Sequence, residues 1–547
     1  MLSAYLFSEN YAVFCMAILV ALSPCAVGQA VFVNAGSTAL EPDGLSWSTA
    51  FQDLQIGIDT AAALGYPEVW VAKGRYTREA AVEVRAGLRA LFFLPDGIEV
   101  YGGFVGVESE RNQRDVLSNE TILDGVSGEV GSPISHFAGA EEYDTADWWV
   151  AYTSGRVVLD GFTLTVAWPE WSDRYIVADY HIGGLRCENA NFKLRNCVFS
   201  GFFRMITQEE PFFGLVALEG SKLDLETVAF DGVQVYFRDS ASNLRFCALY
   251  YCRREFSWHS GNLFWLQDCP QATLVDSYSE LDNRIWGDTV FSATGCTIVG
   301  QIQASGSAVC TFENTIFNPT REVRVANGAQ PFATVWLRTD GQSLISNCTF
   351  VATSNLGTYM EPASSPVIIR NCILGFPDNA VEFYGQHLDV SIEYSSLQND
   401  AAGIGNLYYI DPLFVDPGNG DFRLQAESPC IDAGTIEGAP LYDFDGVKRP
   451  QGTGIDMGAF EYSASAEGEG EGEGEGEGEG EGEGEGEGEG EGEGEGEKLP
   501  PSCHPTTAES GAGWGDWLAM LGTFGVLSGL ARRNPSGSQL RSRLHGR

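Results

Sequence analysis

The chain is poor in basic residues, with 32 lysines and arginines against 75 aspartates and glutamates and a formal net charge of −43. Binding to nucleic acid requires clustered Lys and Arg side chains that face phosphates, so the sequence excludes that class of function. An alternating Glu-Gly run from Glu467 to Glu497 supplies 16 of the acids, and the rest of the chain remains strongly acidic. The same charge disfavours a polyuronate ligand unless cations bridge the two surfaces.

Histidine and the spacings of metal sites are also scarce. The chain has six histidines, and none in its main body lies at metal-ligand spacing from another. No CxxC pair occurs among the 13 cysteines, although zinc sites commonly use that spacing. We therefore expect no metal site and no cofactor. Asp443 and Asp445 resemble half of a calcium loop, but no downstream Glu completes it, so calcium stays an unproven alternative.

No apolar run reaches the roughly 20 residues that a helix needs to span a bilayer. The run Tyr11–Leu22, followed by small residues up to Ala30, is typical of a secretory signal peptide over residues 1–30. The residues before this run contain no Lys or Arg, which is unusual for such a signal. We expect the mature protein to be exported.

A second apolar run lies near the other end, in residues 500–547. Trp517–Ala531 spans 15 residues and is followed by Arg532 and Arg533, an arrangement that resembles bacterial C-terminal sorting signals. We expect this tail to sort the protein or to anchor it in a membrane. The alternative is an amphipathic or disordered tail.

A short repeat is the main feature that the sequence does contain. Ten copies of an eight-residue unit occur between Arg156 and Leu397, and the fullest are FKLRNCVF (Phe192–Phe199) and VIIRNCIL (Val367–Leu374). Apolar residues alternate, an Asn-like residue interrupts them, and Cys or another small residue follows. A strand alternates with period two, so the interruption predicts a bend, and Asn tolerates the left-handed backbone that a bend requires. The small positions are Gly161, Cys197, Val228, Cys247, Cys269, Cys296, Thr315, Cys348, Cys372 and Ser395.

The spacing between these small positions runs from 19 to 36 residues. Short units that cannot bury a face alone stack into a solenoid. Because six of the positions are cysteines, we expect a ladder of buried thiols that pack as small apolar groups. The alternative is a disulfide between Cys348 and Cys372 on adjacent turns, whose strands lie roughly 4.8 Å apart.

A helix is predicted ahead of the repeat. Thr49 and Gln52 have the spacing of a capping box, and Gly65 with Pro67 ends the helical pattern. Its apolar stripe consists of Phe51, Leu54, Ile58 and Ala62. We expect this helix to cap the open end of the solenoid, which would otherwise expose apolar surface and strand edges. Beyond the repeat, the Glu-Gly run makes residues 463–499 an extended, self-repelling linker.

The flanks of the repeat carry further motifs. Their residues are Trp47, Ala50, Phe51, Leu54, Gln55, Val69, Trp70, Val71, Gly74, Tyr76, Tyr101–Phe104, Arg111, Arg114, Asp115, Thr121–Gly125, Asp411–Asp416, Ser428–Gly434 and Asp456–Tyr462. Together with the repeat, they resemble secreted bacterial right-handed parallel β-helix proteins of the pectate-lyase-like superfamily. The resemblance covers roughly residues 31–462. It implies an all-β, single-stranded right-handed parallel β-helix with an N-terminal capping helix, and it implies secretion. That superfamily has no single activity, so no activity follows.

Catalytic signatures known in that superfamily are absent. The chain has neither adjacent aspartates nor the Gly-His-Gly of galacturonan hydrolases, and it lacks the His-bearing lyase motif. The best candidates for catalysis are Arg253, Arg254 and His259, where a base and a charge stabiliser could come from one segment between two repeat copies. The alternative for these residues is solvated charge and a turn histidine.

Large aromatic residues gather around the longest insertion in the repeat. They are Trp148, Trp149, Trp168, Trp171 and Tyr175. Flat rings with polar edges suit stacking on sugars, so these residues are the candidate ligand-binding set. The alternative is a loop that packs on itself.

The sequence therefore predicts a monomer that is secreted or held at the cell surface and binds a polysaccharide or cell-surface glycan without catalysis. One alternative is a polysaccharide lyase or glycosidase that acts through the Arg253–His259 segment. Another is a structural envelope protein without a ligand. We expect no nucleic-acid partner, and membrane contact would come through the C-terminal tail.

Overall fold

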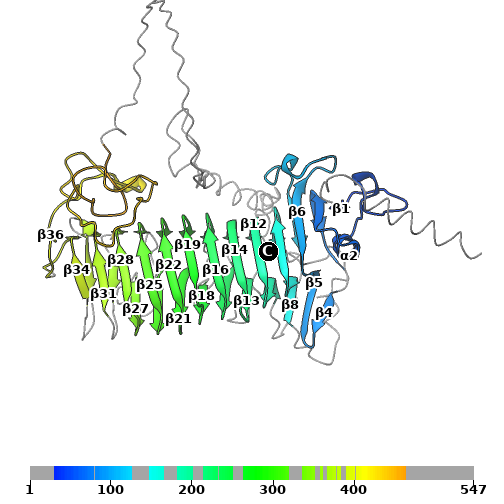
Figure 1. The fold of residues 1–547 in the computed structure, drawn as a ribbon, viewed down its shortest axis with the longest axis horizontal. Helices are drawn as coiled ribbons and strands as arrows, with labels where there is room; N and C mark the ends of the chain where they lie inside the picture. Colours follow the sequence, from blue (N-terminus) through cyan, green and yellow to red (C-terminus); the bar gives the residue numbers. More distant parts are fainter. Residues whose placement is uncertain are drawn as a thin grey trace, which may run out of the picture.

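The computed structural model describes residues 30–78, 81–125, 147–165, 182–200, 213–231, 233–250, 263–318, 335–351, 358–360, 366–376, 379–383, 390–400 and 402–463. Parallel strands stack side by side along an elongated rod, from β1 (Ala30–Val33) near one end to β36 (Leu407–Tyr408) near the other (Figure 1). The predicted parallel β-helix is confirmed. Within these ranges, no helix is both long and apolar enough to cross a membrane.

Each turn of the solenoid, here called a rung, passes through two ladders of parallel strands. Sheet B has one strand per rung, and the hairpin strand β4 (Val82–Arg85) pairs antiparallel with the first of them. Strands of neighbouring rungs stay in register, so a residue of one rung lies beside its equivalent in the next. The sheet B strands are β5 (Leu88–Leu94), β8 (Asp147–Thr153), β11 (Ile182–Glu188), β13 (Phe213–Leu218), β15 (Gln234–Arg238), β18 (Leu263–Gln267), β21 (Asp282–Trp286), β24 (Ile302–Gly306), β27 (Val335–Thr339), β30 (Thr358–Met360) and β33 (Asn379–Phe383).

Sheet A is bent in the middle of every rung, which divides it into two halves. Strands β12 (Asn191–Ser200) and β14 (Lys222–Asp231) run through both halves. The other strands of the first half are β1, β2 (Glu68–Ala72), β6 (Ile98–Phe104), β9 (Arg156–Asp160), β16 (Ala241–Arg245), β19 (Ala272–Val275), β22 (Val290–Thr294), β25 (Val309–Glu313), β28 (Ser343–Ser346), β31 (Val367–Arg370) and β34 (Val390–Glu393). The others of the second half are β3 (Gly74–Tyr76), β7 (Thr121–Asp124), β10 (Thr163–Thr165), β17 (Ala248–Tyr250), β20 (Tyr278–Ser279), β23 (Thr297–Ile298), β26 (Ile316–Phe317), β29 (Thr349–Phe350), β32 (Ile373–Phe376), β35 (Ser396–Leu397) and β36.

From β9 onward, the bend in sheet A is made by one residue per rung in the left-handed conformation. Their φ angles lie between 46° and 85°, and three of the side chains at the far end of the rod are asparagines. Asn reaches this region at lower cost than most residues, which is why the sequence marks the bend. The bend residues are Gly161, Asn196, Thr227, Phe246, Asp276, Gly295, Asn314, Asn347, Asn371 and Tyr394. The predicted bends are confirmed.

Two of the ten predicted small positions were wrong. Cys269 lies at the bend between sheets B and A, after β18, and the position that follows the sheet A bend on that rung is Ser277. Gly161 is itself the bend residue, and Phe162 takes the following position. Asp268 precedes Cys269 with a φ of 52°, so the two kinds of bend share one local pattern.

The small residue after each bend does more than fill space. Cys296 donates its thiol hydrogen toward the carbonyls of Thr294 and Leu274, at 3.3 and 3.2 Å. On the rung before, Ser277 Oγ donates to Val275 O at 2.7 Å, and it accepts from the backbone N–H of Cys247 at 3.0 Å. A buried carbonyl without a partner is costly, which favours a small donor at this position, although Val228 and Phe162 occupy it on two rungs.

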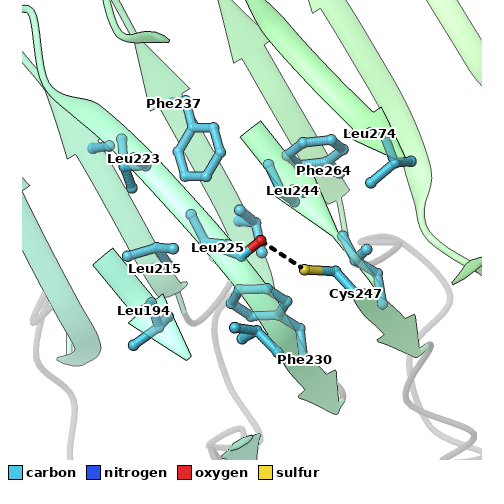
Figure 2. Close-up of a cluster of buried hydrophobic side chains, with 14 of the residues drawn as sticks. Leu194, Leu215, Leu223, Leu225, Phe230, Phe237, Leu244, Cys247, Phe264 and Leu274 are labelled. Carbon is cyan, nitrogen blue, oxygen red and sulfur yellow. Dashed lines mark hydrogen bonds between the residues drawn. The ribbon is translucent and has the colours of Figure 1, made fainter. Parts of the chain in front are cut away.

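Nine cysteines fall within the described residues, and all nine are buried free thiols. Burial raises the pKa of the Cys296 thiol to about 12, so it remains protonated and able to donate. Figure 2 shows the same arrangement at Cys247, whose thiol faces the carbonyl oxygen of Leu225 among stacked Leu and Phe side chains. Cys348 and Cys372 lie on adjacent rungs as separate thiols, with Cys348 N–H directed at Cys372 Sγ at 3.4 Å.

Helix α2 (Leu54–Leu64) covers the N-terminal end of the core, as predicted, and Gly65 ends it with a φ of 69°. The start was predicted wrongly. Asp53 caps the helix by accepting from the backbone of Gln55 and Ile56, whereas the short helix η1 (Trp47–Thr49) lies just before it. A carboxylate directly ahead of the helix satisfies two free N–H groups, which a residue four positions earlier cannot reach.

Both ends of the rod are closed by an amide side chain that pairs with a terminal strand. At the N-terminal end, Gln55 accepts from Phe93 N–H at 2.8 Å and donates to Phe93 O at 2.9 Å. At the other end, Asn406 accepts from Ser395 N–H at 3.0 Å and donates to Ile392 O at 2.9 Å. The primary amide thereby replaces the missing next strand and blocks an open edge.

Residues 402–463, here called the C-terminal segment, fold over the outer side of the sheet A bend. The segment contains β37 (Phe414–Asp416), η4 (Pro417–Asn419) and β38 (Asp421–Leu424) and is drawn in yellow and orange in Figure 1. It buries Ile316, Val351 and Ile373 beneath its own aromatic residues. The bend asparagines hold its backbone. The hydrogen bonds run from Asn314 to Tyr442 O, from Asn347 to Asp456 O and from Asn371 to Thr435 O.

Candidate functional site

The residues predicted for catalysis cannot be placed. Arg253, Arg254 and His259 lie outside the described residues, between Tyr250 at the end of β17 and Leu263 at the start of β18. The described ranges contain no histidine at all. The catalytic assignment therefore stays a prediction.

The predicted aromatic set is placed only in part. Trp168, Trp171 and Tyr175 lie outside the described residues, and of Trp148 the structure places only the backbone, in β8. Trp149 is 3% exposed, and a Cβ on Gly183 would lie only 2.1 Å from its indole. The guanidinium of Arg186 lies 5.5 Å from the ring centre. This ring is packed into the outer surface of sheet B, and the ligand-binding assignment of the set stays a prediction.

A buried ionic network lies beside Trp149. Glu188 is held by Arg85 at 2.7 Å and by Arg186 at 2.6 Å, and Tyr152 Oη donates to it at 3.2 Å. Burial and the nearby carboxylate raise the pKa of Tyr152. Because Arg85 lies on β4, the network fastens the β4 hairpin over the first rungs of sheet B.

Beyond this network, four aromatic side chains on consecutive rungs form a row on the outer face of sheet B. This aromatic stripe consists of Phe213, Tyr236, Trp265 and Trp286. Successive ring centroids are 6.1, 5.1 and 5.2 Å apart, with planes inclined by 41°, 53° and 72°. Trp286 is 38% exposed. Such a row of partly exposed rings is the most distinctive outward feature that the structure describes.

Polar side chains flank the stripe. Strand register places Arg284 beside Trp265, and Gln303 beside Arg284 on the next rung. The Nε of Arg284 and the indole N–H of Trp265 are buried and have no hydrogen-bond partner in the structure. Tyr236 Oη donates to Gln267 at 3.0 Å, and burial raises the pKa of this tyrosine. The face therefore combines ring surfaces with the polar side chains of Arg284, Gln267 and Gln303, which suits a polar ligand with flat apolar faces.

Charge at the stripe is mixed. Arg238 approaches Asp239 at 3.7 Å, and both side chains are largely solvent-exposed. Asp239, Asp268 and Asp288 follow β15, β18 and β21, so each rung of the stripe has a carboxylate near its end. Among the residues described, no group of three or more His, Cys, Asp or Glu side chains could hold a metal ion.

The residues that resembled half a calcium loop take part in the packing of the C-terminal segment. Asp443 accepts from the backbone N–H groups of Asp445, Val447 and Glu461, at 2.9, 2.7 and 2.8 Å. Burial raises its pKa to about 6. Both carboxylate oxygens are thus committed to the backbone, and Asp445 pairs with Arg423 at 2.8 Å.

The flanking motifs have structural roles as well. Arg111 and Arg114 lie on the ring of Tyr101, at 4.5 and 5.1 Å from its centre. Arg114 also pairs with Asp160 at 2.7 Å, which joins the excursion around η2 (Arg111–Gln113) to the first bend of sheet A. Near the other terminus, Arg449 and Glu461 form a fully buried ion pair at 2.6 Å. These residues hold the ends of the fold together and do not line the stripe.

Sequence reasoning missed the aromatic stripe. Trp265 and Trp286 occupy outward positions of sheet B strands, whose inward neighbours Phe264, Leu266 and Ile285 are buried. The sequence signal was an aromatic residue at an alternate position beside the repeat on several successive turns. It could be recognised only once the strands of sheet B were separated from those of sheet A.

Comparison with known proteins yields only distant similarities to solved structures. No protein-family model matches the chain, and no curated protein matches it in sequence. Pectate lyase Pel9A has 12% sequence identity and a TM-score of 0.34, covering 79% of this chain and 96% of its own. The A-module of mannuronan C-5 epimerase AlgE4 from Azotobacter vinelandii has 11% identity and a TM-score of 0.27, covering 66% and 100%. The parallel β-helix of this chain follows from its own strand register.

Proposed function

We propose that this protein is a secreted, envelope-tethered β-helix that binds carbohydrate through the aromatic stripe and has no catalytic role. The stripe itself carries the proposal. Phe213, Tyr236, Trp265 and Trp286 place rings on four consecutive rungs, with centroids 5.1 to 6.1 Å apart. An aromatic ring offers a broad apolar surface with a polar edge, which suits the alternating C–H and O–H groups of a sugar.

The rigidity of the rod supports this function. Each stripe residue lies on a strand that is hydrogen-bonded on both sides and backed by a buried neighbour such as Phe237 or Leu266. Rings held in this way lose little conformational freedom when a ligand binds. A tether formed by the Glu-Gly linker and the C-terminal tail would present such a rod away from the cell.

The test is binding of the full chain to a glycan array, followed by titration of the best ligand. Trp286→Ala should weaken binding by about 2 kcal/mol, or about 30-fold, because a tryptophan ring that a ligand covers commonly contributes that much. Trp286 is partly exposed, so its removal opens no internal cavity. The matched control is Tyr409→Ala, which removes an aromatic side chain that is 61% exposed on the C-terminal segment.

Loss of binding in the Trp286 variant alone supports the proposal, whereas equal loss in both variants contradicts it. The same preparation distinguishes the enzymatic alternative. Release of reducing or unsaturated ends from a polysaccharide, abolished by Arg254→Ala, would replace the binding function with catalysis. Fractionation of cells that express the full chain, compared with a chain ending at Pro500, tests the tether.

A further inference from the structure

The edge of the aromatic stripe is acidic on three successive rungs. Asp239, Asp268 and Asp288 follow their sheet B strands within two or three residues of Tyr236, Trp265 and Trp286. A fully extended chain covers roughly 3.3 Å per residue, so each aspartate lies no more than roughly 7–10 Å along the chain from the residue that carries its ring. This separation is comparable to the Debye length of about 8 Å at physiological ionic strength.

Two arginines do not reverse this charge. Arg238 neutralises Asp239, so Arg284 is the one remaining arginine of the pair, against two carboxylates, those of Asp268 and Asp288. The carboxylate of Asp268 is fixed at this edge, because its Oδ1 accepts from Asp288 N–H at 3.2 Å. The chain as a whole carries −43. The named groups therefore leave a net negative charge along the stripe, which repels a polyanion and does not act on an uncharged polymer.

The spacing of the rings restricts the linkage of the ligand. Tyr236, Trp265 and Trp286 lie 5.1 and 5.2 Å apart from one rung to the next, which is about the length of one pyranose. In a chain with equatorial 1→4 links, each sugar follows the last in a ribbon and keeps its C–H faces accessible. Axial 1→4 links coil the chain and turn these faces away from a continuous row of rings.

The inclination of the rings restricts the physical form of the ligand. The planes of Tyr236 and Trp265 differ by 53°, and those of Trp265 and Trp286 by 72°. A flat crystalline face needs coplanar rings, and these rings do not provide them. A single chain can rotate about its glycosidic bonds and follow inclined rings.

We infer that the ligand is an uncharged, equatorially 1→4-linked pyranose chain that crosses the rungs as a single strand along the aromatic stripe. The inference rests on the proposed function and specifies its ligand class. Asp268 and Asp288 select against anions, and the row from Tyr236 to Trp286 selects the linkage.

The test is calorimetric titration of the full chain at physiological salt with soluble hexasaccharides. Cellohexaose, chitohexaose and mannohexaose are uncharged and equatorially linked. Maltohexaose has axial links between the same sugars as cellohexaose, and hexa-β-1,4-glucuronate, the C6-oxidised form of cellohexaose, keeps the equatorial links but is anionic. We expect at least one of the first three to bind, with about 30-fold loss in Trp286→Ala. Maltohexaose should bind at least tenfold more weakly, and hexa-β-1,4-glucuronate should not bind.

The double variant Asp268→Asn, Asp288→Asn removes two charges and keeps a side-chain oxygen at position 268 that can accept from the backbone N–H of residue 288. It should leave the affinity for the uncharged ligand within twofold and allow weak binding of hexa-β-1,4-glucuronate. Tight binding of hexa-β-1,4-glucuronate or maltohexaose to the original chain, lost in Trp286→Ala, would overturn the inference and leave the proposed function intact. If no saccharide binds in a manner that depends on Trp286, both fail.

Discussion

Replacing Asn371 with alanine should loosen the C-terminal segment from the rod. The side chain is fully buried at a sheet A bend with a φ of 55°. Its amide donates to Thr435 O and accepts from Thr435 N–H, both at 2.8 Å, and also donates to Asn347 at 3.2 Å. The substitution removes all three bonds, two of which hold Thr435 of the C-terminal segment, and it places alanine in the left-handed region.

Each of the two hydrogen bonds lost to Thr435 costs about 1 kcal/mol net, and the left-handed alanine adds about 1 kcal/mol. The expected total of about 3 kcal/mol corresponds to roughly 150-fold more frequent opening of this contact. Hydrogen exchange at the Thr435 amide measures it directly. Asn371→Gly is the matched variant, because glycine accepts the backbone conformation and isolates the hydrogen-bond loss at about 2 kcal/mol, or about 30-fold.

Asn196→Ala is the second control for this experiment. Asn196 also lies at a sheet A bend, but its amide donates to Asp160 and contacts no residue of the C-terminal segment. Exchange across residues 402–463 should therefore remain unchanged in this variant. If Asn196→Ala and Asn371→Ala speed exchange at Thr435 equally, the bend asparagines act through the rod as a whole, and the local docking argument is refuted.

Three further predictions concern stability. In urea unfolding, the free energy of unfolding of Cys296→Ser should stay within about 1 kcal/mol of the original value, since the serine hydroxyl can donate in place of the thiol. The free energy of unfolding of Cys296→Ala should fall by about 1–2 kcal/mol. Equal losses in the two variants would contradict the donor role. Gln55→Ala should cost about 2 kcal/mol by removing both bonds to Phe93, and a melting temperature unchanged from the original would exclude this. Burial raises the pKa of Asp443 and of Asp456 to about 6, so the folded chain binds their protons more tightly than the unfolded chain. The two protonated carboxyl groups stabilise the folded chain fully below about pH 4, and this stabilisation is lost as the pH rises through 6. Between about pH 4 and 7, the melting temperature of Asp443→Asn should therefore fall less than that of the original chain. Equal falls in melting temperature for the two chains would contradict the assignment.

The fold could be predicted because its controlling signals are local. An interrupted apolar alternation identifies a strand, a bend and a second strand within eight residues, and in-register stacking then fixes the solenoid. The misplacement of Cys269 shows where local information ends. Asp268 bends the chain between the two sheets with nearly the same φ as Asn347 within sheet A, at 52° and 50°. Only pairing with strands of neighbouring rungs distinguishes the two bends.

The candidate site could not be predicted for a related reason. The stripe is a contact between rungs, and Trp265 meets Trp286 only because their strands pair in one register. Sequence composition directed attention to Trp149, whose ring is buried under Arg186 and the β4 hairpin. Clustering of aromatic residues along the chain and exposure of their rings are independent properties, and only the second is relevant to a ligand.

The amide groups of Gln55 and Asn406 have a consequence for how such a chain can change length over evolution. Each end of the rod is closed by its own amide side chain, so the closure does not depend on the number of rungs between the two ends. From Ser277 to Cys296 and from Cys296 to Thr315, the chain advances by 19 residues with nothing inserted. Duplication or excision of one such unit would lengthen or shorten the rod by a single strand spacing and leave the closure of both ends unaltered. The length of the rod can thus change independently of the residues that close its two ends.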